Sequence, residues 1–317
     1  MTPEPAQPPA PPEAGRDVFF ESVRQLVRAG PQFEWAQLVA IIVLVYVTSP
    51  TATAMAAFAA VLAIRDLSLL AMMRATDTFD ARLLFIPLGR GEMRVGTTPG
   101  REAVAVLGGP AVLVVISIIT FVTSRIIGPG IVKEMAFGAL GLAAFTLLPL
   151  KPYDGFRLLN LALFSRSARL EVVVSIFTSL VLAAIAVATQ LWFLVFVALV
   201  NAGVSRRVLK VEKGAEIFRQ SGFASVPSTA ELPEEGLRAL FNATLTVFPD
   251  TMGQRQPQHA RFCALLMREV HQRAGRVHPT VGVSVLLLFI YAALIVYFVI
   301  GLIIAVGLTK AGAGPST

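Results

Sequence analysis

The sequence is poor in the residues that most often carry chemistry. Its one cysteine is Cys263, and its three histidines are His259, His271 and His278. A single cysteine excludes an intrachain disulfide and a zinc cluster built from cysteines. Charged residues make up only 15% of the chain, against about a quarter in a typical soluble domain. This shortage of charge argues against a soluble protein.

Long apolar runs take the place of charge. Hydrophobic residues make up 55% of the chain, and the mean hydropathy is +0.71. Several runs approach or exceed ~18 residues, the length at which an apolar segment can cross a bilayer as a helix. We therefore expect an all-α polytopic membrane protein.

The apolar runs divide the chain into a membrane core and flanking segments. Residues 1–16 are rich in proline and read as a disordered tail. Residues 17–35 predict an interfacial helix, in which Arg24 and Arg28 can meet lipid headgroups. An ordinary helical connection to the first span remains an alternative for this segment.

Seven spans are predicted, six in a membrane core at 36–206 and one at 280–309. They are placed at 36–48, 51–74, 102–127, 131–150, 170–188, 191–206 and 281–308. Between the core and the last span, residues 207–279 predict a polar, mostly helical segment. Residues 310–317 form a short polar tail.

Basic residues give the orientation. With the N-terminus inside and the spans alternating, Arg125, Lys133 and Lys310 lie outside, and Arg65 lies within a span. The remaining Lys and Arg residues of the 27 lie inside, which satisfies the positive-inside rule. We therefore expect a multi-pass protein of the inner (cytoplasmic) membrane, with its N-terminus and 207–279 in the cytoplasm.

Two places in the membrane core depart from an ordinary apolar span. The second span contains Arg65 and Asp66 well inside its apolar stretch. The fourth span ends in FTLLPLKPYDGFRL, where Asp154 follows Pro149 and Pro152. Proline removes a backbone donor, and the next glycine, Gly155, relaxes the backbone, so this stretch predicts a broken helix. A carboxylate at membrane depth is costly unless it faces a cavity inside the protein.

The polar segment after the second span contains a further pattern. Residues 81–96, ARLLFIPLGRGEMRVG, predict two short strands around a Gly-Arg-Gly turn. We interpret this segment as a β-hairpin at the membrane surface.

Three segments in this order resemble the core of the site-2 proteases, a family of intramembrane zinc metallopeptidases. LLPLKPYDG at 147–155 resembles the family motif whose aspartate binds zinc, and Asp154 falls on that aspartate. AVLGGPAVLV at 105–114 resembles the Gly-Pro segment that opens another core helix, and LLFIPLGRG at 83–91 is similar to the strand after the zinc-binding helix. The similarity covers roughly 50–205 and implies a groove for a transmembrane substrate.

The second span departs from the family in the residues that matter for chemistry. The resemblance implies His-Glu-x-x-His there, since two imidazoles one turn apart hold zinc and the glutamate activates a bound water. This chain has Arg65 and Leu69 at the two histidine positions and Asp66 at the glutamate position. Thr146 stands where the family motif has asparagine.

These substitutions lead to a hypothesis about the former metal site. Catalytic zinc needs three protein ligands, and a fixed arginine charge repels a metal. We expect no metal and a buried ion pair of Arg65 with Asp154 and Asp66, beside a groove and helix break. The break residues are Gly109, Pro110, Thr146, Pro149, Pro152 and Gly155. The alternative is that Arg65 extends toward headgroups and Asp154 is solvated.

The histidines offer a second metal hypothesis. His259 and Cys263 lie four apart on a predicted helix, with His271 and His278 beyond. Their spacing matches no common zinc pattern. We favour an ordinary amphipathic helix for this stretch.

The sequence thus predicts a zinc-free pseudoprotease that acts as a binding or regulatory scaffold. Its expected partners are membrane lipids and a transmembrane protein, with no nucleic acid. One alternative is an active zinc metalloendopeptidase with an atypical site. Another is a transporter or channel whose buried charges line a pathway.

Overall fold

A computed structural model gives the arrangement of the chain. It describes residues 13–28, 51–78, 94–128, 130–150, 153–190, 192–253 and 257–312. All regular structure in these ranges is helical, in agreement with the predicted all-α class. The predicted span at 36–48 and most of the predicted hairpin at 81–96 lie outside the described residues.

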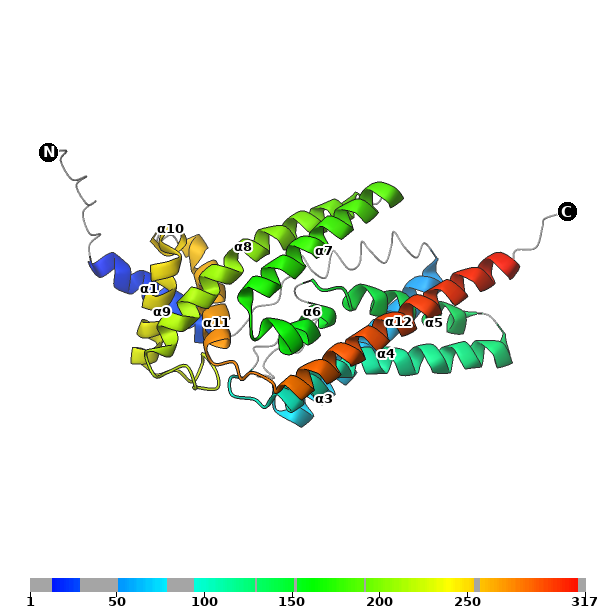
Figure 1. The fold of residues 1–317 in the computed structure, drawn as a ribbon, viewed down its shortest axis with the longest axis horizontal. Coiled ribbons are helices and arrows are strands. Elements are labelled where there is room, and N and C mark those ends of the chain that lie inside the picture. Colours follow the sequence, from blue (N-terminus) through cyan, green and yellow to red (C-terminus); the bar gives the residue numbers. More distant parts are fainter. Residues whose placement is uncertain are drawn as a thin grey trace. The chain divides into compact units, whose positions relative to one another are not determined.

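The described helices follow one another along the chain (Figure 1). They are α1 (Glu13–Arg28), α3 (Ala52–Thr76), α4 (Pro99–Ile127), α5 (Ile131–Thr146), α6 (Asp154–Leu159), the π-helix η1 (Asn160–Phe164), α7 (Ala168–Thr189), α8 (Phe193–Arg219), α9 (Glu234–Val247), α10 (Pro249–Gly253), α11 (Pro257–Ala274) and α12 (Val281–Gly312).

Four of the described helices are long and apolar enough to cross a membrane, which fits a membrane protein. They are the helices at 52–76, 99–127, 168–188 and 281–301. The predicted fourth span is shorter than expected, because α5 has 16 residues and ends at Thr146. The predicted sixth span does not end at 206, because α8 continues as one helix to Arg219.

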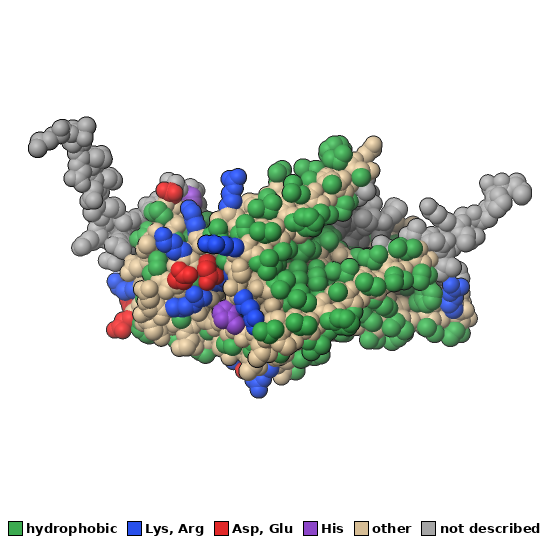
Figure 2. All heavy atoms as spheres, viewed as in Figure 1, with side chains coloured by type: hydrophobic (Ala, Val, Ile, Leu, Met, Phe, Trp, Pro, Cys, Tyr) green, Lys and Arg blue, Asp and Glu red, His purple; other side chains and the backbone are tan. Residues whose placement is uncertain are grey.

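The chain forms two compact units. The first contains residues 1–31 and 210–275, and the second contains 32–209 and 276–317. Figure 2 shows hydrophobic side chains over the visible sides of α7 and α12 in the second unit, whereas charged side chains gather over the first. The second unit thus presents the apolar surface expected of membrane helices.

The first unit surrounds α1 with helices from much later in the chain. Phe19, Phe20, Val23 and Val27 of α1 are buried in a core shared with α9 and α11. The Arg268 guanidinium on α11 donates hydrogen bonds to the carbonyl oxygens of Leu26 and Val27 in the last turn of α1. In the described part of the helix predicted at 17–35, which ends at Arg28, the apolar face is covered by protein, and the contact with lipid headgroups stays a prediction.

The second unit is built on close packing among α3, α4 and α5. The last helix, α12, packs against α5, α6 and η1. Their shared core is apolar and includes Val61, Leu113, Leu142, Leu158 and Phe298.

Helix α4 does not break at the glycines and proline where the sequence predicted a break. It runs from Pro99 to Ile127 with Pro110 inside it. Membrane helices tolerate an internal proline where neighbouring helices cover the freed backbone. Gly108, Gly109 and Pro110 are all buried, so this part of α4 is enclosed by protein.

Candidate functional site

The spacing of buried residues on α3 directs Arg65 into the protein. The buried positions are Ala57, Val61, Arg65, Leu69 and Met73, each four residues from the next. Residues four apart lie on one face of a helix, so Arg65 shares the face that packs on α4 and α5. Its side chain is only 1% exposed.

The break after α5 places Asp154 opposite Arg65. Helix α5 ends at Thr146, and α6 begins at Asp154. The chain between them turns back closely, because a Cβ atom added at Gly155 would lie 1.9 Å from the Leu147 carbonyl oxygen. Only glycine fits that position, and it sets Asp154 in the first turn of α6, where a negative charge is favoured by the helix dipole.

The turn is held from two further sides. The Tyr291 hydroxyl on α12 donates a 2.8 Å hydrogen bond to the Leu147 carbonyl oxygen. The rings of Phe145 and Tyr153 meet across the break, with centroids 4.8 Å apart. Asp154 therefore lies on a backbone fixed by packing as well as by its own ion pair.

Arg65 joins two carboxylates. Its Nη2 donates to Asp154 Oδ2, and its Nη1 donates to Asp66 Oδ1 at 2.7 Å. Asp154 is as buried as Arg65, at 1% exposure, whereas the Asp66 side chain is 24% exposed. The structure thus brings together the three residues that the sequence singled out, and neither Arg65 nor Asp154 faces solvent.

Gly109 of α4 forms the wall of this charged cluster. A Cβ atom added there would lie 3.2 Å from Asp154 Oδ2 and 3.4 Å from Arg65 Nε. Glycine therefore leaves the room that the guanidinium and the carboxylate need. Helices α3, α4 and α6 each contribute a residue to one compact site.

Other residues of the predicted site play different parts. Leu69 is buried against Met73 and Ala105, and the Thr146 hydroxyl bonds to the carbonyl oxygen of Ala143 in its own helix. Pro149 lies in the break between α5 and α6, and Pro152 is outside the described residues.

The residues of the charged cluster do not fit a zinc ion. Zinc takes Cys, His or carboxylate ligands, but here both carboxylates are bonded to one arginine and the Leu69 side chain has no donor atom. Across the described part of the chain, no three His, Cys, Asp or Glu side chains lie close enough to hold a metal ion. The arrangement can hold charge inside the protein and can pair with another charged or polar group.

A second polar cluster in the same unit was not anticipated from the sequence. Glu102 of α4 is 6% exposed, and Arg276 and Arg157 act on it electrostatically. Arg276 Nη1 also donates a 2.8 Å hydrogen bond to Asn160 Oδ1, at the start of the π-helix. The sequence feature that could have revealed this cluster is Glu102 itself, a glutamate at the start of the span predicted at 102–127.

A polar bond between α7 and α8 was also missed. Asn201 Nδ2 donates to the Ser175 carbonyl oxygen at 2.9 Å and to Ser179 Oγ at 3.0 Å. An asparagine inside an apolar run is the signal that would have found it, since such residues commonly bond between membrane helices.

His271 and Cys263 are buried inside the first unit. Cys263 is buried, and burial raises the pKa of its thiol to about 11, which makes it a poor nucleophile. His271 is fully buried beside Phe218, and burial lowers its pKa to about 4. Burial alone would raise the pKa of Glu212, but its hydrogen bond and charge pairing with Arg273 lower it.

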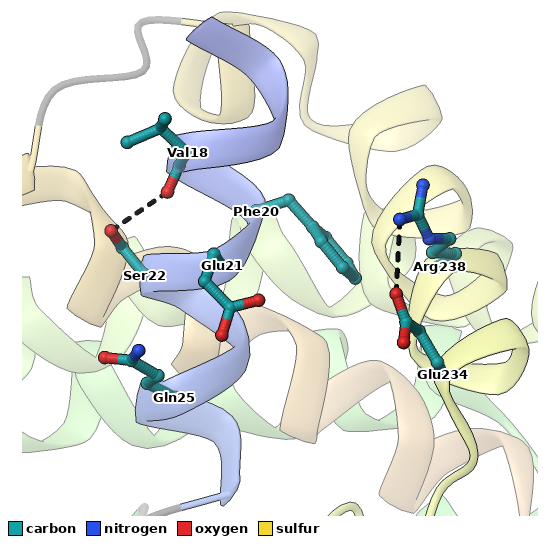
Figure 3. A pocket seen from close by; sticks show the side chains of 7 residues that line it. All are labelled: Val18, Phe20, Glu21, Ser22, Gln25, Glu234 and Arg238. Atoms are coloured by element: carbon teal, nitrogen blue, oxygen red, sulfur yellow. Dashed lines mark hydrogen bonds and ion pairs between the residues drawn. The ribbon is translucent and has the colours of Figure 1, made fainter. Parts of the chain in front are cut away.

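A shallow pocket of about 430 Å³ lies between α1 and α9 (Figure 3). Its charged side chains already have partners, since Arg238 bonds to Glu234 at 3.2 Å and lies over the Phe20 ring, and Glu21 pairs with Arg24 at 3.2 Å. Val18, Phe20, Glu21, Ser22, Gln25, Glu234 and Arg238 line it. We assign no ligand to this pocket.

Comparison with known proteins gives no relative for this chain. No protein-family model, curated protein or solved structure matches it.

Proposed function

We propose that this chain is a zinc-free, site-2 protease-like membrane protein that binds a transmembrane partner as a scaffold. The observation that carries the proposal is the ion pair between Arg65 and Asp154. The sequence resemblance assigns a zinc ligand to each of these two positions. A guanidinium bonded to the carboxylate supplies the positive charge that a metal would otherwise supply.

The chemistry of the cluster supports a binding role over hydrolysis. Zinc hydrolases activate water on a metal with an open coordination position. Arg65 is a permanent cation and offers no such position. Its two carboxylate partners are both engaged, which leaves neither as a base poised over a metal-bound water.

The surroundings of the cluster support a transmembrane partner in particular. Asp66 is partly exposed on α3, next to apolar side chains such as Leu67, which is 65% exposed. A helix of another membrane protein could cover this apolar face and reach the polar group.

Metal content tests the proposal directly. We expect the full chain, extracted in mild detergent without chelator, to contain far less than one zinc per molecule by elemental mass spectrometry. Asp154→Asn should leave that value unchanged. Glu134→Gln, a carboxylate change elsewhere in the same unit, is the matched control.

Stoichiometric zinc in the wild type that disappears in Asp154→Asn would overturn the proposal in favour of an active metallopeptidase. Stoichiometric zinc that survives the substitution would place the metal elsewhere and would equally contradict a zinc-free protein.

A further inference from the structure

We infer that the cluster of Arg65, Asp66 and Asp154 binds a transmembrane helix that carries one lysine or arginine at the depth of Asp66. This inference deepens the proposed scaffold role and rests on it. It specifies the chemistry of the partner, which the fold alone leaves open.

The cluster contains more negative than positive charge. Arg65 is the one cation that the structure pairs with Asp66 and Asp154 among the described residues. With both carboxylates ionised, the cluster carries one net negative charge. A net charge inside a membrane is costly until an opposite charge compensates it.

The net negative charge counted among the described residues can be reached from outside at one member of the cluster. Arg65 and Asp154 are each 1% exposed, whereas Asp66 is 24% exposed. One oxygen of Asp66 accepts from Arg65 Nη1 at 2.7 Å. Asp66 is therefore the member of the cluster that a group from outside can contact.

The surface beside Asp66 suits a second helix. Ala59 and Ala63 precede Asp66 by seven and three residues, and both are exposed. Positions spaced in this way follow one face of a helix. Small side chains let another helix backbone approach closely, so a bond to Asp66 can form at short range.

Two arginines of the chain itself compete with a partner's cation for this role. The predicted first span at 36–48 contains no charged residue, so it cannot supply the missing positive charge. Residues 79–93 contain Arg82 and Arg90. The experiment must therefore separate a partner's cation from these two arginines.

The test uses the full chain in phosphatidylcholine nanodiscs and two synthetic transmembrane helices. The helices share one Leu/Ala sequence with uncharged ends and differ only at the centre, which is lysine in one and leucine in the other. Binding is measured by fluorescence energy transfer. We expect the wild type to bind the lysine helix about tenfold more tightly, the range of a polar bond between membrane helices.

The variants assign the preference to Asp66. Asp66→Asn should bind both helices equally, and Asp66→Glu should keep the preference, which also guards against a folding defect in the first variant. Glu134→Gln should behave as wild type, because it removes a partly buried carboxylate from another helix of the same unit.

Equal binding of both helices by the wild type, or an unchanged preference in Asp66→Asn, would overturn the inference. A preference that emerges only in Arg82→Ala/Arg90→Ala would overturn it too, because the chain's own arginine would then occupy Asp66. Equal, tight binding of both helices would leave the scaffold proposal standing. Stoichiometric zinc would remove that proposal whatever the helices do.

Discussion

Arg65 and Asp154 carry opposite charges, and each is stable in its buried position because it pairs with the other. Both are buried to 1% exposure, and they come from helices far apart in the sequence. Removing one partner from a buried ion pair leaves an uncompensated charge, which typically costs about 3–5 kcal/mol. Removing both side chains leaves a cavity, but neither charge of the pair remains buried without its partner.

The two charges should therefore be coupled in a double-mutant cycle. Arg65→Ala and Asp154→Ala should each lower the thermal stability of the detergent-solubilised protein strongly. The double variant should lose less than the sum of the two single losses, with a coupling of at least ~1 kcal/mol. Additive losses would contradict a functional pairing of the two side chains.

His271 makes the first unit sensitive to acid. Burial lowers its pKa in the folded protein to about 4, below the ordinary histidine value of 6.5. Between these values the unfolded chain binds a proton that the folded chain does not, so stability is full above pH ~6.5 and falls toward pH ~4. The loss should approach ~3 kcal/mol.

Hydrogen exchange of the α11 amides, corrected for the intrinsic effect of pH, measures this loss. His271→Phe, which keeps an aromatic ring beside Phe218, should flatten the pH dependence. Replacing the exposed His278 with glutamine should leave it unchanged. An acid-insensitive wild type would show that His271 does not control the stability of this unit.

The turn between α5 and α6 is the element on which the site depends. Gly155→Ala would drive a Cβ atom into the Leu147 carbonyl, so we expect loss of folded protein. Gly141 is the matched control, since no atom lies within 4 Å of a Cβ added there. Gly141→Ala should be neutral or stabilise α5 by up to about 1 kcal/mol.

Yield and thermal stability of the two variants in detergent check this prediction. If Gly155→Ala folded as well as Gly141→Ala, the close approach of α6 to the end of α5 would not be required for the fold.

The sequence contained much of the information for the charged cluster. An arginine four residues from Val61 and Leu69 lies on the apolar face of its helix, and an acid behind two prolines marks a helix break. The sequence pattern could not reveal that α4 continues through Pro110, because the continuation of the helix depends on the protein that encloses Pro110. The bond from Tyr291 to Leu147 was likewise hidden, since 144 positions separate the residues.

The environment of α1 could not be predicted from its sequence pattern. Phe19 and Val23 form an apolar face that suits a membrane surface and a protein core equally well. The helices that bury it begin only after residue 210. Local periodicity could predict the helix but could not choose between these two environments.

The first unit contains segments from both ends of the membrane core, and this constrains how often the chain between them crosses the membrane. Since α1 and 210–275 pack into one unit, we predict that both lie on the same side of the membrane. On this prediction the chain between them crosses the membrane an even number of times. Three of the four membrane-length helices among the described residues lie in that interval, so the prediction requires at least one further crossing there.

Reporter fusions or cysteine labelling from each side check the topology. Tags before α1 and in the connection between α9 and α11 should report the same side. A tag after α12 should report the opposite side, because that helix crosses once more. Reporters on opposite sides for α1 and the 210–275 segment would contradict the fold of the first unit.

The burial of α1 has a consequence for the order of synthesis. The ribosome delivers this helix before its core partners, which emerge only after the intervening membrane segments have been made. Until then Phe19, Phe20 and Val23 have no partner from their final core. The first unit can therefore form only after the intervening chain has been inserted. A stalled or mis-inserted chain would leave the apolar face of α1 exposed to the cell's quality control.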